Sequence, residues 1–284
     1  MKVRKVGVVG LGTMGAGIAQ VCVQAGIETV GREVSDELGE AARGRIDHYL
    51  GRGIEKGRLS EDERAAELER LTTTSRVEDL ADCDLVIEAV VEELDVKRAL
   101  FADLDRLVRP DAVLATNTSA LSVTDIAEAT ERPERVVGMH FFNPAPVLPL
   151  VEVVRTEQSS DEAVETAYVF AERIGKQPIR CGDTPGFVVN RILIPLLNDC
   201  VRVLDEAGVT PEDLDTAMTA GLNWPIGPCA LIDLIGIDVH VHASEALRSA
   251  LGEARMEPPV RLRQMLEEGR LGRKSGAGFF VYET

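Results

Sequence analysis

The sequence lacks an apolar run long enough to span a membrane. A long uncharged stretch, Thr216–Ile232, is interrupted by two prolines and two glycines, whereas a spanning helix needs about 20 mostly apolar residues. A secretory signal is also missing, because the charged start of the chain leads at once into Val6–Gly10, which is far too short for the apolar part of such a signal. We therefore expect a cytoplasmic protein with no transmembrane helix.

Cysteine is scarce, and no two cysteines form a Cys-x-x-Cys pair. An odd, scattered set of five indicates neither a disulfide framework nor a zinc site. Of the four histidines, His240 and His242 stand two residues apart and therefore face different sides of a helix. We expect chemistry that uses no metal ion. The cysteines, expected as small core residues, are Cys22, Cys83, Cys181, Cys200 and Cys229.

Basic charge is also in short supply. The chain has 31 basic and 48 acidic residues, which gives a net charge of -17. Such a surface repels the phosphates of nucleic acids and anionic membranes, so we expect neither as a partner. The 284 residues, 45% hydrophobic and 28% charged, are instead typical of a globular protein with two domains.

The first two thirds of the chain alternate between short apolar runs and helical stretches. This alternation predicts an α/β fold with a Rossmann-like, doubly wound, mostly parallel sheet. A strand at 150–154 is expected to run back beside the strand before it, and a helix follows at 161–174. The other strands are expected at 5–9, 27–31, 84–92, 113–116 and 135–140, and the other helices at 16–25, at 96–108 and from Ser122.

Two regions depart from this alternation. Residues 34–70 are dense in charge with apolar residues at helical spacing, which predicts two amphipathic helices with a solvated outer face. From Phe187 the pattern is helical, punctuated by glycine and proline, with a strand signal only at 279–282. We therefore expect a domain at 1–183 that carries a helical arm, followed by a smaller all-α domain at 184–284.

A glycine motif, Gly10-x-Gly12-x-x-Gly15, lies between the first strand and the first helix. It lets the backbone approach a pyrophosphate, to which the helix N-terminus presents partial positive charge. Glu33, at the end of the second strand, can accept the ribose hydroxyls and would repel a 2′-phosphate. NAD is therefore favoured over NADP, although the adjacent Arg32 leaves that preference open. The alternative is a glycine turn beside a surface glutamate.

His140 ends an apolar strand at the sheet edge where doubly wound folds bind their ligands. Glu152 lies within the returning strand, where a buried carboxylate needs a partner, and the return would bring it alongside His140. An imidazole that is oriented and made more basic by a carboxylate suits a general base for an alcohol proton. A purely structural His–Glu pair is the alternative.

Further polar groups are expected near this edge. Asn117 and Ser119 follow the strand at 113–116, and Asn190 follows Pro185–Val189 at the domain junction. Their hydroxyl and amide groups can hold a substrate oxygen or polarise a carbonyl. Taken singly, Ser119 is equally a turn residue, and Asn190 is equally a hydrogen-bonding residue of a helix or loop.

Together these motifs resemble those of the short-chain 3-hydroxyacyl-CoA dehydrogenases, in particular the bacterial 3-hydroxybutyryl-CoA dehydrogenases. The resemblance runs nearly end to end, and its most specific blocks are His140–Pro144 and Pro185–Arg191. It is also carried by the glycine motif and by residues 83–89, 117–119, 138–147, 183–191 and 271–279.

The resemblance implies a role for each candidate residue. His140 would be the catalytic base, oriented by Glu152, while Ser119 and Asn190 would bind the C3 oxygen of the substrate. The cofactor would be NAD. Its implied contacts are Gly10, Leu11, Gly12, Thr13, Met14, Gly15, Glu33, Glu92, Lys97, Asn117, Asn143 and Lys274.

The same resemblance makes the arm a cover for the nucleotide of an acyl-CoA substrate. Lys56 would bind the substrate phosphates with help from Arg52, unless both are merely solvated charges. The implied reaction is the reversible oxidation of an L-3-hydroxyacyl-CoA. A homodimer is expected through the C-terminal domain, whose apolar stretches include 192–197 and 230–237. The alternatives are a sister dehydrogenase of a free sugar acid such as L-gulonate, and a non-catalytic NAD-binding relative.

Three positions depart from the family pattern. Ala120 replaces a second serine, which can change a hydrogen bond to substrate or nicotinamide. Glu33 replaces a shorter aspartate, which can change cofactor affinity. Gly31 replaces a bulky residue and is expected to weaken its strand.

Overall fold

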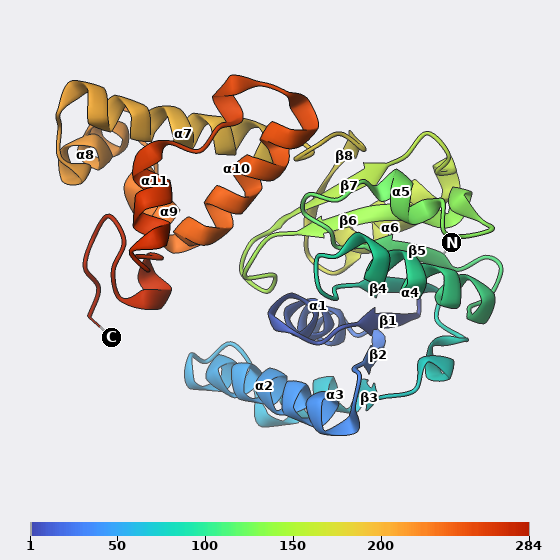
Figure 1. Ribbon diagram of the computed structural model, residues 1–284. Coiled ribbons are helices and arrows are strands. Elements are labelled where there is room, and N and C mark those ends of the chain that lie inside the picture. Colours follow the sequence, from blue (N-terminus) through green and yellow to red (C-terminus); the bar gives the residue numbers. More distant parts are fainter. Residues whose placement is uncertain (1, 284) are drawn as a thin grey trace. The chain divides into compact units, whose positions relative to one another are not determined.

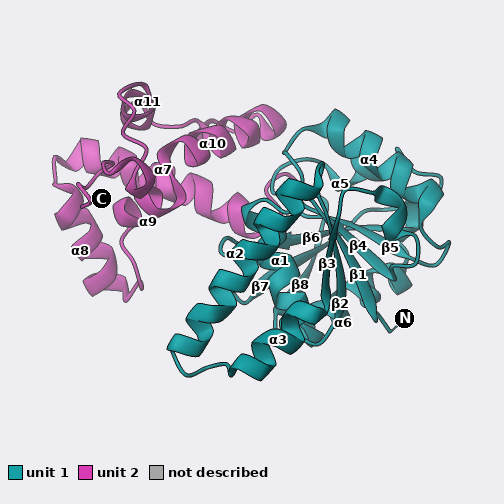
Figure 2. Ribbon diagram, turned by 90° about the horizontal axis from the view of Figure 1, so that it is seen from below, with its two compact units in different colours: residues 1–184 teal, residues 185–284 magenta. Residues whose placement is uncertain are grey.

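The computed structural model describes residues 2–283 and divides the chain into two compact units, residues 1–184 and 185–284 (Figure 2). Each unit has an apolar core of its own. No helix among the described residues is long and apolar enough to cross a membrane.

The first unit is built on an eight-stranded sheet of order β3-β2-β1-β4-β5-β6-β7-β8. Strands β1 to β6 are parallel, in the order typical of dinucleotide-binding folds. β7 runs antiparallel to β6, and β8 pairs parallel with β7. The mostly parallel, doubly wound sheet and its returning strand are thus confirmed. The strands are β1 (Lys5–Val9), β2 (Glu28–Arg32), β3 (Leu71–Thr74), β4 (Leu85–Glu88), β5 (Val113–Thr116), β6 (Val136–Phe141), β7 (Leu150–Arg155) and β8 (Gln177–Gly182).

The helices of the first unit include the two expected in the arm. α2 begins after Ser35, whose side chain accepts a hydrogen bond from Leu38 N, and α3 begins with a capping box formed by Ser60 and Glu63. In Figure 1 the two helices lie beside each other at the β3 end of the sheet. The helices of this unit are α1 (Thr13–Gln24), α2 (Asp36–Glu55), α3 (Glu61–Glu69), α4 (Leu94–Leu107), α5 (Val123–Ala127) and α6 (Asp161–Arg173).

The second unit is helical, as expected. Gly208, in the left-handed conformation, ends its longest helix, and the Asp215 carboxylate accepts hydrogen bonds from Cys229 N and Ala230 N at the start of another. The buried Asp233 anchors the C-terminal tail by accepting hydrogen bonds from the N–H groups of residues 279 and 280. The helices are α7 (Val189–Ala207), α8 (Pro211–Leu222), α9 (Pro228–Ile235), α10 (Ile237–Leu251) and α11 (Val260–Glu267).

The strand expectations were wrong in four places. The strand expected at 84–92 is shorter, because the chain turns after Glu88, whose carboxylate accepts a hydrogen bond from Val90 N. The sequence analysis missed β3 and β8, which are partly exposed and therefore lack a continuous apolar run. The tail at 279–282 forms no named strand and has only an isolated bridge between Ala277 and Val281.

Candidate active site

The three glycines of the motif shape the loop between β1 and α1. Gly10 has a φ of 86°, and a Cβ on it would lie 2.8 Å from the carbonyl oxygen of Ala89. A Cβ on Gly15 would lie 1.7 Å from the carbonyl oxygen of Gly10. Gly12 differs, because nothing lies within 4 Å of its Cβ position and, as the residue before α1, it gives the helix no side-chain cap. Open space at a helix N-terminus without acidic residues in its first turn fits a dinucleotide pyrophosphate.

Glu33 and Arg45 hold the same loop through Leu11. Oε1 of Glu33 accepts a hydrogen bond from Leu11 N at 2.6 Å, and Arg45 donates to Leu11 O at 2.8 Å. The fully buried Leu11 side chain also explains the glycine in β2, since a Cβ on Gly31 would lie 2.7 Å from Leu11 Cδ1. Gly31 therefore makes room for the β1–α1 loop at the position where the family pattern has a bulky residue.

His140 and Glu152 lie opposite each other in the antiparallel pair of β6 and β7. His140 Nδ1 is 2.7 Å from Glu152 Oε2, and both side chains are buried. When Nδ1–H donates to the carboxylate, Nε2 becomes the basic nitrogen of the ring. The Phe142 ring packs against the imidazole with 4.5 Å between the ring centroids. The geometry fixes the orientation of the ring, and a protonated His140 would face the Glu152 carboxylate.

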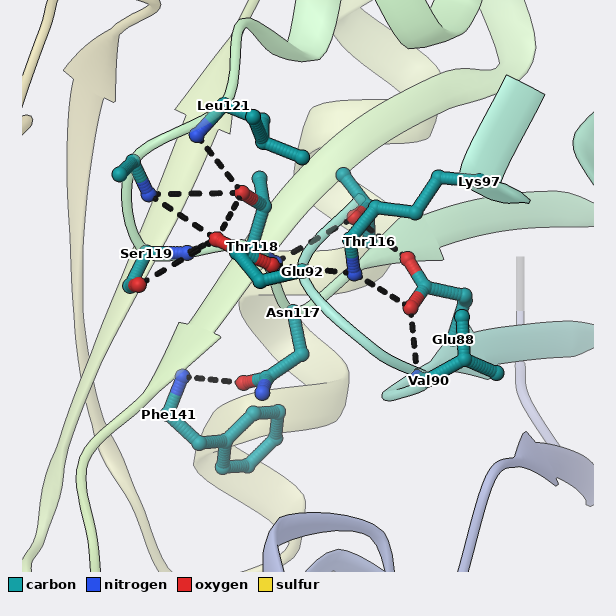
Figure 3. A network of polar contacts seen from close by, with 11 residues as sticks. Glu88, Val90, Glu92, Lys97, Thr116, Asn117, Thr118, Ser119, Leu121 and Phe141 are labelled. Atoms are coloured by element: carbon teal, nitrogen blue, oxygen red, sulfur yellow. Dashed lines mark hydrogen bonds and ion pairs between the residues drawn. The ribbon is translucent and has the colours of Figure 1, made fainter. Parts of the chain in front are cut away.

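A second polar cluster is formed by Glu88, Glu92, Lys97 and residues 116–120, and we call it the Ser119 network. It lies at the ends of β4 and β5 (Figure 3). Glu92 Oε1 accepts hydrogen bonds from Thr118 Oγ1 at 2.6 Å, from Ser119 N at 2.8 Å and from Ala120 N at 3.2 Å. Asn117 Oδ1 accepts a hydrogen bond from Phe141 N at 2.9 Å. This bond ties the loop that carries Ser119 to the residue that follows His140.

Lys97 lies at the centre of the Ser119 network and is only 1% exposed. Its ammonium is 2.5 Å from Glu88 Oε1 and 3.2 Å from Glu92 Oε2. Although burial disfavours the charged form of Glu92, Lys97 and the hydrogen bonds from Thr118 and Ser119 hold the pKa of this carboxyl below its ordinary value. The glutamate and the lysine assigned to the cofactor by resemblance therefore form one ion pair.

The arm borders a cavity of about 510 Å³ that is lined by Arg45, Arg52, Lys56 and Arg58 but by no carboxylate. Within residues 2–283, none of these four cations lies within 4.0 Å of a carboxylate oxygen. Sequence reasoning missed Arg45, although it precedes Arg52 by seven residues on the same face of α2. The lining also includes Thr13 from the cofactor loop and residues 143–147 from the segment after His140. The cavity thus extends from the cations of the arm to the β1–α1 loop and to the segment after His140.

The remaining candidates are placed as follows. Asn143 is exposed on the segment after β6, and Met14 is half-buried against the core of the first unit. Asn190 and Lys274 belong to the second unit. Asn190 is half-buried in the first turn of α7, while Lys274 Nζ is paired with Asp238 at 2.6 Å.

Fold and site together define an oxidoreductase that uses a dinucleotide cofactor, with a binding loop after β1 and a buried histidine–glutamate pair at the edge of the same sheet. Comparison with known proteins makes this specific. The family model described as "3-hydroxyacyl-CoA dehydrogenase, NAD binding domain" matches residues 5–184, and the C-terminal domain model of the same family matches residues 186–282. The chain belongs to the 3-hydroxyacyl-CoA dehydrogenase family, and NAD is its cofactor.

Relatives agree over the whole chain. A probable 3-hydroxybutyryl-CoA dehydrogenase of Deinococcus radiodurans is 44% identical over 98% of this chain and 100% of its own length. A 3-hydroxybutyryl-CoA dehydrogenase of Mycobacterium tuberculosis is 46% identical over 99% of both chains. Among solved structures, FadB2 of Mycobacterium tuberculosis has a TM-score of 0.96 at 46% identity, and the (S)-3-hydroxybutyryl-CoA dehydrogenase PaaH1 of Ralstonia eutropha has 0.96 at 40%, each over 100% of both chains. The predicted family, fold class and cofactor are confirmed.

Proposed function

We propose that the protein interconverts an L-3-hydroxyacyl-CoA and the corresponding 3-ketoacyl-CoA, with 3-hydroxybutyryl-CoA as its substrate. The observation that carries this proposal is the cavity beside the arm, where four cations and no carboxylate line a space that reaches the cofactor loop. In a chain with a net charge of -17, such a lining selects an anionic ligand. The phosphates of CoA supply that charge, whereas a free sugar acid has no nucleotide to place there.

The residues of the first unit suit the chemistry of the reaction. NAD, when bound, would supply the hydride acceptor for C3 of the hydroxyacyl group. Nε2 of His140 takes the hydroxyl proton, and the Glu152 carboxylate stabilises the resulting imidazolium. Ser119 holds the substrate oxygen during the transfer, and the resemblance assigns the same role to Asn190 of the second unit. The substrate loses one hydride and one proton, and the base returns the proton to solvent.

NAD is proposed to bind along the β1–α1 loop. Gly10–Gly15 at the N-terminus of α1 would hold the pyrophosphate, and Glu33 would accept hydrogen bonds from the ribose hydroxyls. Asn117, Asn143 and Lys274 are further proposed contacts. A 2′-phosphate would meet the Glu33 carboxylate, so NADH should be used in preference to NADPH.

The reaction is tested by following reduced-nicotinamide absorbance after acetoacetyl-CoA is added. We expect rapid loss with NADH, much slower loss with NADPH, and none when free acetoacetate replaces the thioester. No loss with acetoacetyl-CoA, under conditions where NADH fluorescence shows binding, would contradict the assigned substrate. Turnover of L-gulonate in that case would favour the sugar-acid dehydrogenase.

The CoA site is tested by Lys56→Met, which removes one cation from the cavity. A charge-assisted hydrogen bond contributes about 1.5–3 kcal/mol, so KM for acetoacetyl-CoA should rise roughly 10- to 100-fold while kcat changes little. Lys2→Met is the matched control, because Lys2 is exposed and lies outside the cavity lining. An unchanged KM in Lys56→Met would show that Lys56 is only a solvated charge.

The second unit is proposed to form a homodimer interface along α7. Ile192, Leu196 and Val203 are exposed at 62%, 37% and 48% on this helix. An exposed apolar stripe of this kind is typical of an interface. Light scattering should give twice the chain mass of 30.8 kDa, and Ile192→Glu should give the single-chain mass. A wild-type protein with the single-chain mass would contradict the dimer.

A further inference from the structure

A single carboxylate oxygen organises the loop that carries Ser119. Besides the three donors described above, Ser119 Oγ itself lies 3.3 Å from Glu92 Oε1, so all four donors to this atom come from residues 118–120 (Figure 3). Two of these donors are backbone N–H groups, which can be satisfied here only by an acceptor. An ionised carboxylate is a stronger acceptor than a neutral carboxyl, so the ionised form of Glu92 stabilises this loop.

The charge opposite Glu92 is buried and fixed in place. Lys97 reaches Glu92 from α4, and its ammonium is held on its other side by Glu88, which is fully buried. The carboxylate of Glu88 is itself fixed by hydrogen bonds from Thr116 Oγ1 and Val90 N, both at 2.7 Å. Lys97 is 1% exposed and forms ion pairs with both Glu88 and Glu92. Its charge is therefore shielded from solvent and acts on these two carboxylates.

We propose that Glu88 and Lys97 are positioning residues, which act through Glu92 to hold Ser119 in place for the substrate oxygen. Lys97 would then affect catalysis through this relay, in addition to the cofactor contact that the resemblance implies for it. The proposal rests on the proposed function only in giving Ser119 that oxygen as its ligand. The relay also explains why alanine can replace the second serine at position 120. Glu92 accepts a hydrogen bond from the backbone N–H of Ala120, and this bond needs no side-chain hydroxyl.

The relay has a signature in pH. Two charged side chains act on the Glu92 carboxylate, Lys97 directly and Glu88 through Lys97, while residues 118–120 contribute only N–H and hydroxyl groups. Loss of the Lys97 charge would let Glu92 take up a proton at a higher pH, and a protonated carboxyl is a poorer acceptor for the N–H groups of the loop. The acid limb of the kcat profile should then move to higher pH.

The test uses the double variant Glu88→Gln/Lys97→Met. Replacement of Lys97 alone would leave a buried, unpaired carboxylate and endanger folding, whereas the double variant removes both charges together. We expect kcat for acetoacetyl-CoA, measured at saturating NADH, to fall about 10- to 100-fold, and the acid limb to move to higher pH. In a Ser119→Ala background the double variant should cost little further, because both changes act through one hydroxyl.

Two measurements separate the relay from other roles. Amide hydrogen exchange at Ser119 and Ala120 should accelerate about tenfold or more in the double variant, and this readout stands even if wild type fails to reduce acetoacetyl-CoA. Lys176→Met is the matched control, because Lys176 is also buried but donates to the carbonyl oxygens of Ala145 and Leu148. It should leave the acid limb and both amides unchanged. Unaltered amide exchange at Ser119 and Ala120 in the double variant would overturn the proposal.

Discussion

Each unit contains one buried histidine, and the two differ in the partner that meets the ring. In the first unit, His140 Nδ1 lies 2.7 Å from the carboxylate of Glu152. In the second unit, His240 Nε2 lies 2.9 Å from the amide oxygen of Asn198. The residues are similarly buried, at 6% exposed for His140 and 0% for His240.

The partner decides what each ring can do. An amide oxygen can accept a hydrogen bond but cannot neutralise a charge, and burial lowers the pKa of His240 to about 4. His240 therefore stays neutral near pH 7 and joins α7 to α10 through Asn198. The anion beside His140 can stabilise an imidazolium, which is the requirement for a base that takes a proton during turnover. Burial alone thus does not mark a catalytic histidine.

The largest expected effect comes from removing the base. His140→Gln should lower kcat by about two to four orders of magnitude, because no other group is proposed to take the hydroxyl proton. Stopped-flow or steady-state absorbance would give kcat, and NADH fluorescence should show nearly unchanged cofactor affinity. His240→Gln is the matched control and should keep kcat per folded molecule within about twofold. Equal losses in the two variants would abolish the distinction between the histidines.

A smaller effect is expected when the partner of His140 is made like that of His240. Glu152→Gln replaces the carboxylate by an amide of similar size, so the ring can stay oriented while its cationic form loses the anion. We expect kcat to fall about 10- to 1000-fold with a folded sheet, checked by circular dichroism. Full activity in Glu152→Gln would show that the carboxylate only fills space between β6 and β7.

Much of the first unit could be predicted from sequence because its strands are buried on both faces. β1, β5 and β6 are continuous apolar runs, and such runs are direct signals of parallel strands. β3 and β8 lie at the two edges of the sheet, where exposure removes the apolar signal. The His140–Glu152 pair was predicted for a physical reason too, since a glutamate within an apolar strand needs a partner.

The Ser119 network could not be predicted in the same way. Lys97 lies in a helix rich in charged residues, where a lysine is normally solvated, and only the fold shows that it turns inward to Glu88 and Glu92. The cationic face of the arm was only half predicted. Arg52 and Lys56 were found by resemblance, whereas Arg45 required attention to the helical spacing between charges.

The smallest expected effect concerns stability and arises at His240. Its pKa is about 4 in the folded protein, below the ordinary value of 6.5, so as pH falls the unfolded chain takes up a proton before the folded one does. The stability associated with the neutral ring is complete above about pH 6.5 and is lost towards pH 4, a change of about 3 kcal/mol. His240→Gln should remove that part of the acid sensitivity, while His242→Gln, at an exposed position of α10, should not. Urea unfolding followed by Trp224, the single tryptophan and a residue of the second unit, would measure it, and parallel pH dependences in wild type and His240→Gln would contradict it.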